Sequence, residues 1–431
     1  MRQLFMILTG SLMGIVAMSQ TITLEECLEN TRANFPLLDQ KIVQQEMGES
    51  LSNALWYAYI PQLALEGRMT HQSHVTELDV TMPQLPGMPP MVLDLPEIPK
   101  LQYQAYLQAT QLIWDGGRVN AGSRKIKAET EVHQAEVDVQ LQKIEEAVTE
   151  LYFSLLMLER QQELQQILIN ELARQERRIA SALNNGVATE NDLDLLRVER
   201  LKAEQSSEQL QISREAVLES LSLYTGRELS TEIKAAIPTV PVFATKEEER
   251  LASQRAEHAL FDAKLRSAEA SWQSYKAGGM PTIALFARGG YGRPGLNMLN
   301  PDPMSFYIGG ITLSWNFGKL YDFDAQRKKL QGTSLLIELQ RQALEREIAS
   351  KEAQYTAEAR QYQALVDKDK EIVALRKRVA ERGKLQENEG TLSTTDYLQQ
   401  ISNYHAAEQT AEVHRLQYLR ALYRLKNNFG L

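Results

Sequence analysis

The hydrophobic pattern of this chain switches repeatedly between two periods. In short stretches apolar residues recur at every second position, and in much longer stretches they recur at every third or fourth position. The first period predicts β-strands and the second predicts helices. The change from strand to helix falls twice on a glycine-containing turn that follows a tryptophan. These two predicted junctions consist of Trp114, Asp115, Gly116 and Gly117, and of Trp315, Asn316 and Gly318.

The reverse change, from helix to strand, falls each time on a proline. Pro61 and Pro281 each precede an alternating stretch, and a proline blocks continuation of the helix before it. The prolines and the tryptophan turns together bound four predicted strands, which cover about 62–71, 101–114, 282–291 and 305–317.

Each predicted strand is apolar on one face and polar on the other. In the first strand, Leu63, Leu65 and Met69 share one face, while Glu66 and Arg68 lie on the opposite face. Strands of this length, with aromatic residues near their ends, suit a barrel with lipid outside and water inside. Alternation alone also fits a two-sided sheet in a soluble domain, so the strands leave both alternatives open.

The helical stretches are unusually long. One runs from Gly117 to about Leu183 and another from Phe323 to about Arg382, both without a proline. At the rise of an α-helix the first would be about 100 Å long. Its apolar residues alternate spacings of four and three, which is typical of coiled-coil packing. Shorter helices are predicted at about 22–58, 190–223 and 394–427.

The order helix, strand, strand, long helix, helix occurs twice, which indicates an internal duplication. We therefore divide the mature chain into a first repeat, 20–224, and a second repeat, 246–431. The segment 225–245 joins them, because its glycine, prolines and β-branched residues break the helical pattern. A tip turn between the long helix and the returning helix is predicted at about 184–192 and again at about 384–396.

The N-terminus has the layout of a secretory signal peptide. Arg2 supplies a positive charge, Leu4–Val16 is mostly apolar, and the small residues Ala17 and Ser19 precede a cleavage site before Gln20. The apolar run is too short for a spanning helix. We therefore exclude residues 1–19 from the fold and predict that the mature protein is exported.

The composition excludes several classes of protein. The chain is 43% apolar and 24% charged, which is typical of a folded protein. Its net charge of −9 does not suit a nucleic-acid surface. Cys27 is the only cysteine, so no intrachain disulfide can form. Because two glutamates precede it rather than the small residues needed for lipid attachment, we predict a buried structural thiol.

With the signal peptide, the duplicated order of elements, the Trp-Asp-Gly-Gly-Arg junction at 114–118 and the two tip turns, residues 21–431 resemble the TolC family of outer-membrane efflux proteins. The resemblance implies a mainly α fold with a transmembrane β-barrel contribution. Three copies with four strands each would make one 12-stranded barrel in the outer membrane, and the helices would form a coiled-coil α-barrel across the periplasm. Segment 225–245 would be the equatorial linker.

The same resemblance implies a function without catalysis. The homotrimer would be a passive duct for efflux or type I secretion, coupled to an inner-membrane pump through a periplasmic membrane-fusion adaptor. The pump would select the cargo, so the tunnel wall does not specify a drug, a metal ion or a polypeptide. The alternative function is an exported periplasmic coiled-coil scaffold without a membrane barrel.

In the family, the second tip turn runs Gly-Thr-Arg-x-x-x-Asp-x-x-Asp, and its aspartates narrow the periplasmic entrance. Gly390, Thr391 and Asp396 match this pattern, whereas Leu392 replaces the arginine and Gln399 replaces the second aspartate. A ring of three Asp396 carboxylates would favour cations. A leucine, however, cannot make the ion pairs of the arginine, so the resemblance leaves the gating contacts of this chain open.

The first tip turn has residues at positions that correspond to those of the second tip turn. Some residues of both turns are also suited to capping the helices that follow. The candidates for the periplasmic entrance and the adaptor contact are Gly186, Thr189, Asp192, Gly390, Thr391, Ser393, Asp396 and Gln399. Thr189 and Ser393 are also expected to cap the returning helices, since hydroxyl side chains accept hydrogen bonds from free backbone N–H groups.

Two other patterns in the sequence resemble binding sites. Gly290–Gly295 matches a dinucleotide fingerprint, but no helix follows it, so we expect a hairpin loop and no cofactor. His71, His74 and the Met-rich loop 82–91 could bind a soft metal ion or could simply decorate a surface loop, and no metal is assigned. The sequence shows no paired nucleophile and base, so we expect no enzyme activity.

Overall fold

The computed structural model describes residues 21–430 except 76–97, 187, 242–254 and 299. The predicted signal peptide and the Met-rich loop 82–91 therefore lie outside the described residues. Among the described residues, no helix has both the length and the apolar character that crossing a membrane requires.

The chain forms two compact units, each built from segments that are distant in sequence. The sheet unit consists of Ile42–Ala135 and Leu260–Gln340. The helical unit consists of Met1–Lys41, Glu136–Ala259 and Arg341–Leu431. Both units draw on the two predicted repeats, because the strands of each repeat pack together and so do the helical tips.

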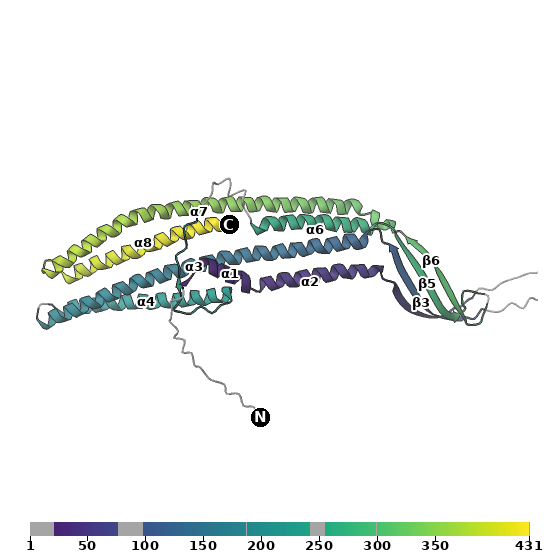
Figure 1. The fold of residues 1–431 in the computed structure, drawn as a ribbon, viewed down its shortest axis with the longest axis horizontal. Coiled ribbons are helices and arrows are strands. Elements are labelled where there is room, and N and C mark those ends of the chain that lie inside the picture. Colours follow the sequence, from purple (N-terminus) through teal and green to yellow (C-terminus); the bar gives the residue numbers. More distant parts are fainter. Residues whose placement is uncertain (1–20, 76–97, 187, 242–254, 299, 431) are drawn as a thin grey trace, which may run out of the picture. The chain divides into compact units, whose positions relative to one another are not determined.

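The sheet unit contains one four-stranded antiparallel sheet in the order β2-β3-β5-β6 (Figure 1). The strands are β2 (Gln62–His71), β3 (Leu101–Trp114), β5 (Thr282–Arg293) and β6 (Met304–Ser314). β3 and β5, which come from different predicted repeats, are neighbours in the centre of the sheet. β2 and β6 are the edge strands, and neither has a second partner within the described part of the chain.

The register places most of the apolar residues of the four strands on one face. Leu65 pairs with Leu107, and Leu285 pairs with Ile311. This face is exposed rather than packed: Leu65 is 80% exposed and Ile311 is 71% exposed. A soluble domain rarely leaves so continuous an apolar surface uncovered.

A β-bulge interrupts the pairing of β3 with β5. Leu112 pairs with Ala284 and Trp114 pairs with Ile283, so Ile113 is an extra residue. A bulge re-aims the side chains that follow it. Strict alternation along β3 would have placed Trp114 on the polar face. The bulge instead brings it onto the apolar face, opposite Ile283.

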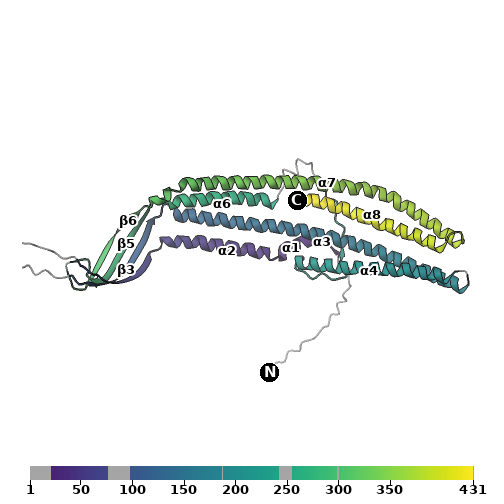
Figure 2. The same cartoon turned by 180° about the vertical axis from the view of Figure 1, so that it is seen from behind.

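Four helices are the neighbours of the strands along the chain: α2 (Leu37–Trp56), α3 (Arg118–Asn184), α6 (Ala256–Gly278) and α7 (Phe323–Asn388). The short helix η1 (Tyr57–Tyr59) lies between α2 and β2. Next to the sheet the four helices lie side by side in the order α2, α3, α6, α7, the order of their strands (Figures 1 and 2). Three contacts within the sheet unit support this order. They join Ser52 to Ser123 at 2.6 Å, Arg266 to Glu131 at 2.9 Å, and the rings of Trp272 and Phe323 at 4.7 Å.

The helical unit contains two antiparallel helical hairpins. α4 (Glu190–Thr225) returns along α3, and α8 (Thr394–Asn428) returns along α7 (Figure 2). The Gln165 amide of α3 donates to the Ala203 carbonyl of α4 at 3.0 Å. In the second hairpin, His414 of α8 lies 2.7 Å from Asp369 of α7.

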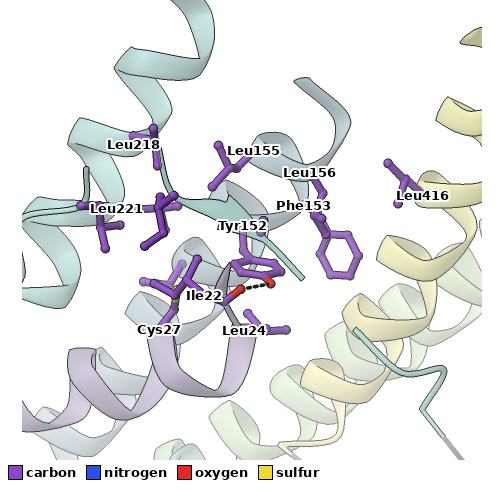
Figure 3. Packing of buried hydrophobic residues seen from close by; sticks show 14 of the residues in the cluster. Ile22, Leu24, Cys27, Tyr152, Phe153, Leu155, Leu156, Leu218, Leu221 and Leu416 are labelled. Atoms are coloured by element: carbon purple, nitrogen blue, oxygen red, sulfur yellow. Dashed lines mark hydrogen bonds between the residues drawn. The ribbon is translucent and has the colours of Figure 1, made fainter. Parts of the chain in front are cut away.

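A fully buried cluster joins the N-terminal segment to α3, α4 and α8, and Figure 3 shows part of it. The Tyr152 hydroxyl lies 2.9 Å from the Ile22 carbonyl and 2.6 Å from the Ala236 carbonyl. These carbonyls flank a short parallel pair between β1 (Thr21–Ile22) and β4 (Lys234–Ala235). The first residues described and the predicted linker are therefore held together on α3.

Cys27 lies in the same cluster and is fully buried. Burial and the nearby Glu26 carboxylate raise the pKa of its thiol to about 12. The prediction of a buried structural thiol is confirmed. A thiol in this environment stays protonated at neutral pH and reacts slowly.

The first helix differs from its expected span of about 22–58. The chain forms α1 (Leu24–Asn34) and then α2, with a break at Phe35 and Pro36. The break follows from Pro36, which disfavours helical geometry at the residue before it. Phe35 is accordingly extended, with φ −76° and ψ 133°.

Three other boundaries differ from expectation. β6 ends at Ser314, so the strand expected to reach residue 317 is too long. The Asn316 side chain instead accepts a hydrogen bond from the Gly318 N–H and starts the short helix η2 (Phe317–Leu320). α7 continues to Asn388, past the expected start of the second tip turn at 384. Leu385 and Glu389 are joined by a helical hydrogen bond of 3.0 Å, which shows that the helix is intact there.

The expected hairpin loop at 290–295 is wrong in part, because Gly290 and Gly292 lie within β5. A Cβ atom at Gly290 would lie 2.5 Å from the Ala105 carbonyl oxygen, and one at Gly292 would lie 2.7 Å from that of Tyr103. These glycines therefore allow β5 to approach β3 closely.

Candidate functional site

The first junction between sheet and helix is organised by the carboxylate of Asp115. The carboxylate accepts hydrogen bonds from the N–H groups of Gly117 at 2.8 Å and Val119 at 2.6 Å. Burial of Asp115 raises its pKa, but these hydrogen bonds outweigh the burial and hold the pKa below its ordinary value. Asp115 therefore caps α3 while it is ionised.

The next residues of this junction fasten it to the second repeat. The Arg118 guanidinium donates to the carbonyls of Gly278 at 3.0 Å and Met280 at 2.9 Å, at the end of α6. Gly116 has φ 69°, and a Cβ atom there would lie 2.4 Å from the Met280 Cβ and 2.9 Å from the Pro281 oxygen. The tryptophan junction of one repeat thus contacts the helix-to-strand proline of the other.

The second junction uses different residues for the same turn. The indole N–H of Trp315 donates to the Gly279 carbonyl at 3.0 Å. Its ring lies 4.5 Å from that of Phe317. Tyr275 of α6 donates to the Asp322 carboxylate just before α7 begins. The structure therefore brings the two predicted junctions together around the C-terminus of α6.

Exposed aromatic side chains surround this end of the sheet. Six of them are between 45% and 89% exposed: Trp56, Tyr57, Trp114, Trp315, Phe317 and Tyr321. Near the opposite end, the apolar face carries Tyr103, Tyr291 and Tyr307, which are also exposed. Two rows of aromatic residues with aliphatic residues between them are typical of a β-sheet that contacts lipid.

The height of this apolar band can be estimated from β3. From Tyr103 to Trp114 the strand extends about 35–37 Å at the usual rise per residue. With the strand tilt of about 40° found in membrane barrels, the height becomes about 27–29 Å. The hydrocarbon-facing band of a transmembrane β-barrel is about 25 Å tall, so the spacing fits a membrane.

The opposite face of the sheet carries a polar network across three strands. The Arg288 guanidinium donates to the Gln108 side chain at 2.6 Å and lies 4.2 Å from the centre of the Tyr106 ring. The Tyr106 hydroxyl donates to the Glu66 carboxylate. The two faces of the sheet therefore differ in chemistry, although Phe286, Phe306 and Ile308 lie on the same face as this network.

At the first tip turn, Gly186 and Thr189 take separate tasks. Gly186 has φ 72°, which ends α3 with a left-handed residue. Thr189 caps α4: its hydroxyl oxygen accepts from the Asp192 N–H at 3.2 Å, and the Asp192 carboxylate accepts from the Thr189 N–H at 3.1 Å. The predicted capping role of Thr189 is confirmed.

The second tip turn has the same design. Gly390 has φ 75°, and the Thr391 N–H donates to the Gln386 carbonyl at 2.9 Å. The Ser393 hydroxyl oxygen accepts from the Asp396 N–H at 3.1 Å and donates to the Asp396 carboxylate at 2.6 Å. The predicted capping role of Ser393 is confirmed, and the Asp396 side chain stays exposed.

The two tips are joined by residues that the sequence pattern did not indicate. Arg178 of α3 donates to Glu387 and Asn388 at the end of α7. The Gln175 amide of α3 donates to the Glu171 carboxylate at 3.1 Å and lies 3.3 Å from the Tyr397 hydroxyl of α8. Helical periodicity alone carried no signal for these contacts, because their partners lie more than 200 residues away in sequence.

Two of these residues are held in a dry environment. The Glu387 side chain is 7% exposed, whereas its partner Arg178 is 36% exposed, so water reaches the ion pair only from the arginine side. Tyr397 is 2% exposed. Its burial and the nearby Glu171 carboxylate raise its pKa to about 12. Tyr397 is therefore neutral at physiological pH and remains a hydrogen-bonding group.

The remaining candidates are not assembled into a site. His71 and His74 are exposed near the start of the loop whose Met-rich part lies outside the described residues. Within the described ranges, no three residues of the types His, Cys, Asp and Glu are grouped closely enough to hold a metal ion. Gln399 bonds to Asn403 on its own helix at 3.2 Å.

Solved structures of other proteins have the same architecture, although their sequences differ strongly from this one. No protein-family model and no curated protein sequence matches the chain. The outer membrane protein VceC of Vibrio cholerae has a TM-score of 0.66 at 14% identity, covering 94% of this chain and 96% of VceC. The CmeC outer membrane channel of Campylobacter jejuni has a TM-score of 0.67 at 12% identity, covering 94% of this chain and 85% of CmeC.

The MtrE outer membrane channel of Neisseria gonorrhoeae, in its open state, has a TM-score of 0.64 at 17% identity, covering 94% of this chain and 88% of MtrE. The chain therefore has the fold of these outer-membrane channels over 94% of its length. The mainly helical fold expected from the resemblance to the TolC family is confirmed.

Proposed function

We propose that this protein is an outer-membrane duct for efflux or export, passive and without enzyme activity. The observation that carries the proposal is the four-stranded sheet, whose exposed apolar face lies between two rows of aromatic residues. A soluble scaffold would expose this apolar face to water, which soluble proteins rarely do. The similarity in fold to outer membrane channels supports the same function.

The edges of the sheet support assembly of several copies. Four strands are too few to close a barrel, because even eight leave an interior just wide enough for side chains. The outer edges of β2 and β6 are unpaired within the described residues, and open edges favour pairing with another chain. If β6 of one copy pairs with β2 of the next, the antiparallel alternation continues, and three copies make a 12-stranded barrel.

The tip turns are the proposed periplasmic entrance and adaptor contact. They expose short glycine-containing turns next to capped helices, and Asp396 presents a carboxylate to solvent. Three such carboxylates around an axis would favour cations. The segment 225–245 is the proposed equatorial linker, since β4 ties its described part to the N-terminal strand. An inner-membrane pump would supply the energy.

Membrane fractionation tests the duct directly. Cells expressing the full chain would be separated into inner-membrane, outer-membrane and periplasmic fractions, and each fraction treated with an amine-reactive cross-linker. We expect a trimer in the outer membrane whose mature N-terminus is Gln20. Recovery of the protein in the soluble periplasmic fraction would overturn the duct and leave the coiled-coil scaffold.

The Arg178 contacts predict how the entrance responds to mutation. Replacing Arg178 by Ala removes the charged hydrogen bonds between the two hairpins at their tips. Because Arg178 is partly exposed, we expect the docked arrangement to lose about 1–2 kcal/mol, which is about a 5- to 30-fold shift toward separated hairpins. Single-channel recordings in planar bilayers should then show a higher conductance than the wild type.

Arg177 provides the matched control, since it is the adjacent arginine and is exposed. The Arg177→Ala channel should keep the wild-type conductance, and both variants should form the same amount of outer-membrane trimer. If Arg178→Ala and the wild type had equal conductance, these contacts would not be what keeps the entrance narrow.

A further inference from the structure

A polar recess lies between three helices of the sheet unit, close to the strands. Its lining comes from α3, α6, α7 and η2, with α6 between the other two long helices (Figures 1 and 2). The recess has a volume of about 570 Å³, which is within the range of pockets that hold small molecules. We call it the lysine recess, because Lys125, Lys319 and Lys329 belong to its lining.

The three lysines come from separate elements. Lys125 lies near the start of α3, Lys319 lies in η2 and Lys329 lies near the start of α7. The first belongs to the first predicted repeat and the other two belong to the second. The fold therefore gathers ammonium groups from both repeats around one recess.

The positive charges of the recess are only partly balanced. Lys125 lies 3.6 Å from Glu129, which is also part of the lining. The nearby Asp322 carboxylate accepts a hydrogen bond from the Tyr275 hydroxyl. Lys329 forms no ion pair with any residue that the structure describes. The recess therefore keeps an excess of positive charge, which favours an anionic ligand.

The end of α6 leaves room for one of the ammonium groups. Gly278 is the last residue of α6, and a Cβ atom there would lie 3.2 Å from the Lys319 Nζ atom. The Lys319 ammonium group therefore lies directly over the backbone of Gly278, at the wall of the recess.

Aromatic rings form another part of the wall. The rings of Trp272 and Tyr275 have centroids 6.1 Å apart and are inclined by 10°. The Trp272 ring also lies 4.7 Å from the ring of Phe323. These contacts hold the indole in place. An aromatic wall beside positive groups suits a ligand that has an anionic head and an apolar part.

We propose that the lysine recess binds a phosphate-bearing anion. A phosphate group presents several oxygens around one small centre, so lysines that approach from three elements can contact it together. Lysine binds phosphate as a point charge, whereas a planar carboxylate is better matched by the fork of an arginine.

The position of the recess allows two sources of this phosphate. Gly278 comes three positions before Pro281, and Lys319 comes four positions after Trp315. The recess therefore adjoins the aromatic row at this end of the sheet. If the sheet lies in a membrane, phospholipid headgroups lie at this level, and basic pockets between helices bind such headgroups. A soluble phosphate ester is the other source.

Ligand titration of the purified full chain tests the site. The protein in a nonionic detergent would be titrated with phosphatidylglycerol or phosphatidylcholine, and the bound lipid would be measured by native mass spectrometry. We expect tighter binding of phosphatidylglycerol, because the choline group of the other lipid would bring a positive charge toward the lysines. Added salt should weaken this binding, since it screens exposed charges.

Competition with glycerol 3-phosphate distinguishes the two sources. If glycerol 3-phosphate displaces phosphatidylglycerol at a similar concentration, the phosphate group alone is recognised, and a soluble phosphate ester is the ligand. If it does not, the ligand is a lipid headgroup together with its apolar part. Both results support the site.

Lysine variants show whether the recess is responsible. Lys319→Gln combined with Lys329→Gln removes two of its three ammonium groups. An exposed ion pair changes an affinity by up to about fivefold, so the double variant should bind phosphatidylglycerol about 5- to 25-fold more weakly. Lys329→Gln alone serves if the double variant does not fold. The matched control is Lys328→Gln, because Lys328 is exposed on the same helix but lies outside the recess, and it should bind like the wild type.

Two results would overturn the site. If phosphatidylglycerol binds no more tightly than phosphatidylcholine, the charges of the recess do not select an anion. If Lys328→Gln weakens binding as much as the double variant, the lysines act only through the overall charge of this region. Neither result bears on the duct, whose test is the fractionation of membranes.

Discussion

Replacing Ile311 by Arg is expected to prevent stable insertion of the protein into the outer membrane. Ile311 lies on the exposed apolar face of β6, four residues from Tyr307 and four from Trp315, and pairs with Leu285. An arginine on the lipid face near the middle of a membrane barrel costs about 2–4 kcal/mol per copy. Because each trimer would carry three such residues, the amount of outer-membrane trimer should fall sharply, as measured by quantitative immunoblotting of separated membranes.

The neighbouring residue supplies the control. Thr312 is also exposed in the isolated chain but lies on the opposite, polar face and pairs with Ala284. A substitution of Thr312 by Arg would face water inside the barrel, so its effect should stay within about 0.5 kcal/mol. If the sheet belongs to a soluble scaffold, both faces meet water, and the two arginine variants should behave alike.

A side chain at Gly116 is expected to disrupt the junction between sheet and helices. The residue has φ 69°, where an L-residue costs about 1–2 kcal/mol. The added Cβ would also lie 2.4 Å from the Met280 Cβ, and such overpacking costs about 1–3 kcal/mol. Gly116→Ala should therefore destabilise the protein by about 2–5 kcal/mol per copy, measured by urea unfolding of the reconstituted protein.

Gly117 separates the two causes, because it has φ 84° but no atom within 4 Å of an added Cβ. Gly117→Ala should show the backbone cost alone, about 1–2 kcal/mol. Equal effects of the two alanine variants would mean that the contact between Gly116 and the Met280–Pro281 turn does not contribute to stability.

The parts of the fold that depend on nearby residues could be read from the sequence. Alternation along each strand, the long helical periods and the two tryptophan junctions follow from side-chain pattern and turn chemistry within a few residues. The caps at Thr189 and Ser393 are equally local, since each bonds to a residue three positions on. The strand face that carries Leu65 and Ile311 was predictable for the same reason.

Some local expectations failed where one residue altered the geometry. Pro36 divides the first helix, and Asn316 ends the fourth strand by accepting a hydrogen bond from Gly318. The extra residue Ile113 turns Trp114 to the apolar face. A bulge depends on the register of two strands that are far apart in sequence, so alternation within one strand could not reveal it.

By itself, the sequence determined the type and approximate extent of the elements, the turns that join them and the chemistry of each sheet face. Only the tertiary structure decided which distant elements meet. It placed β3 beside β5, β1 beside β4 and Arg178 beside Glu387, which is 209 positions away. The physical reason is that helix periods and caps are set by neighbouring residues, whereas contacts between hairpins depend on how the whole chain packs.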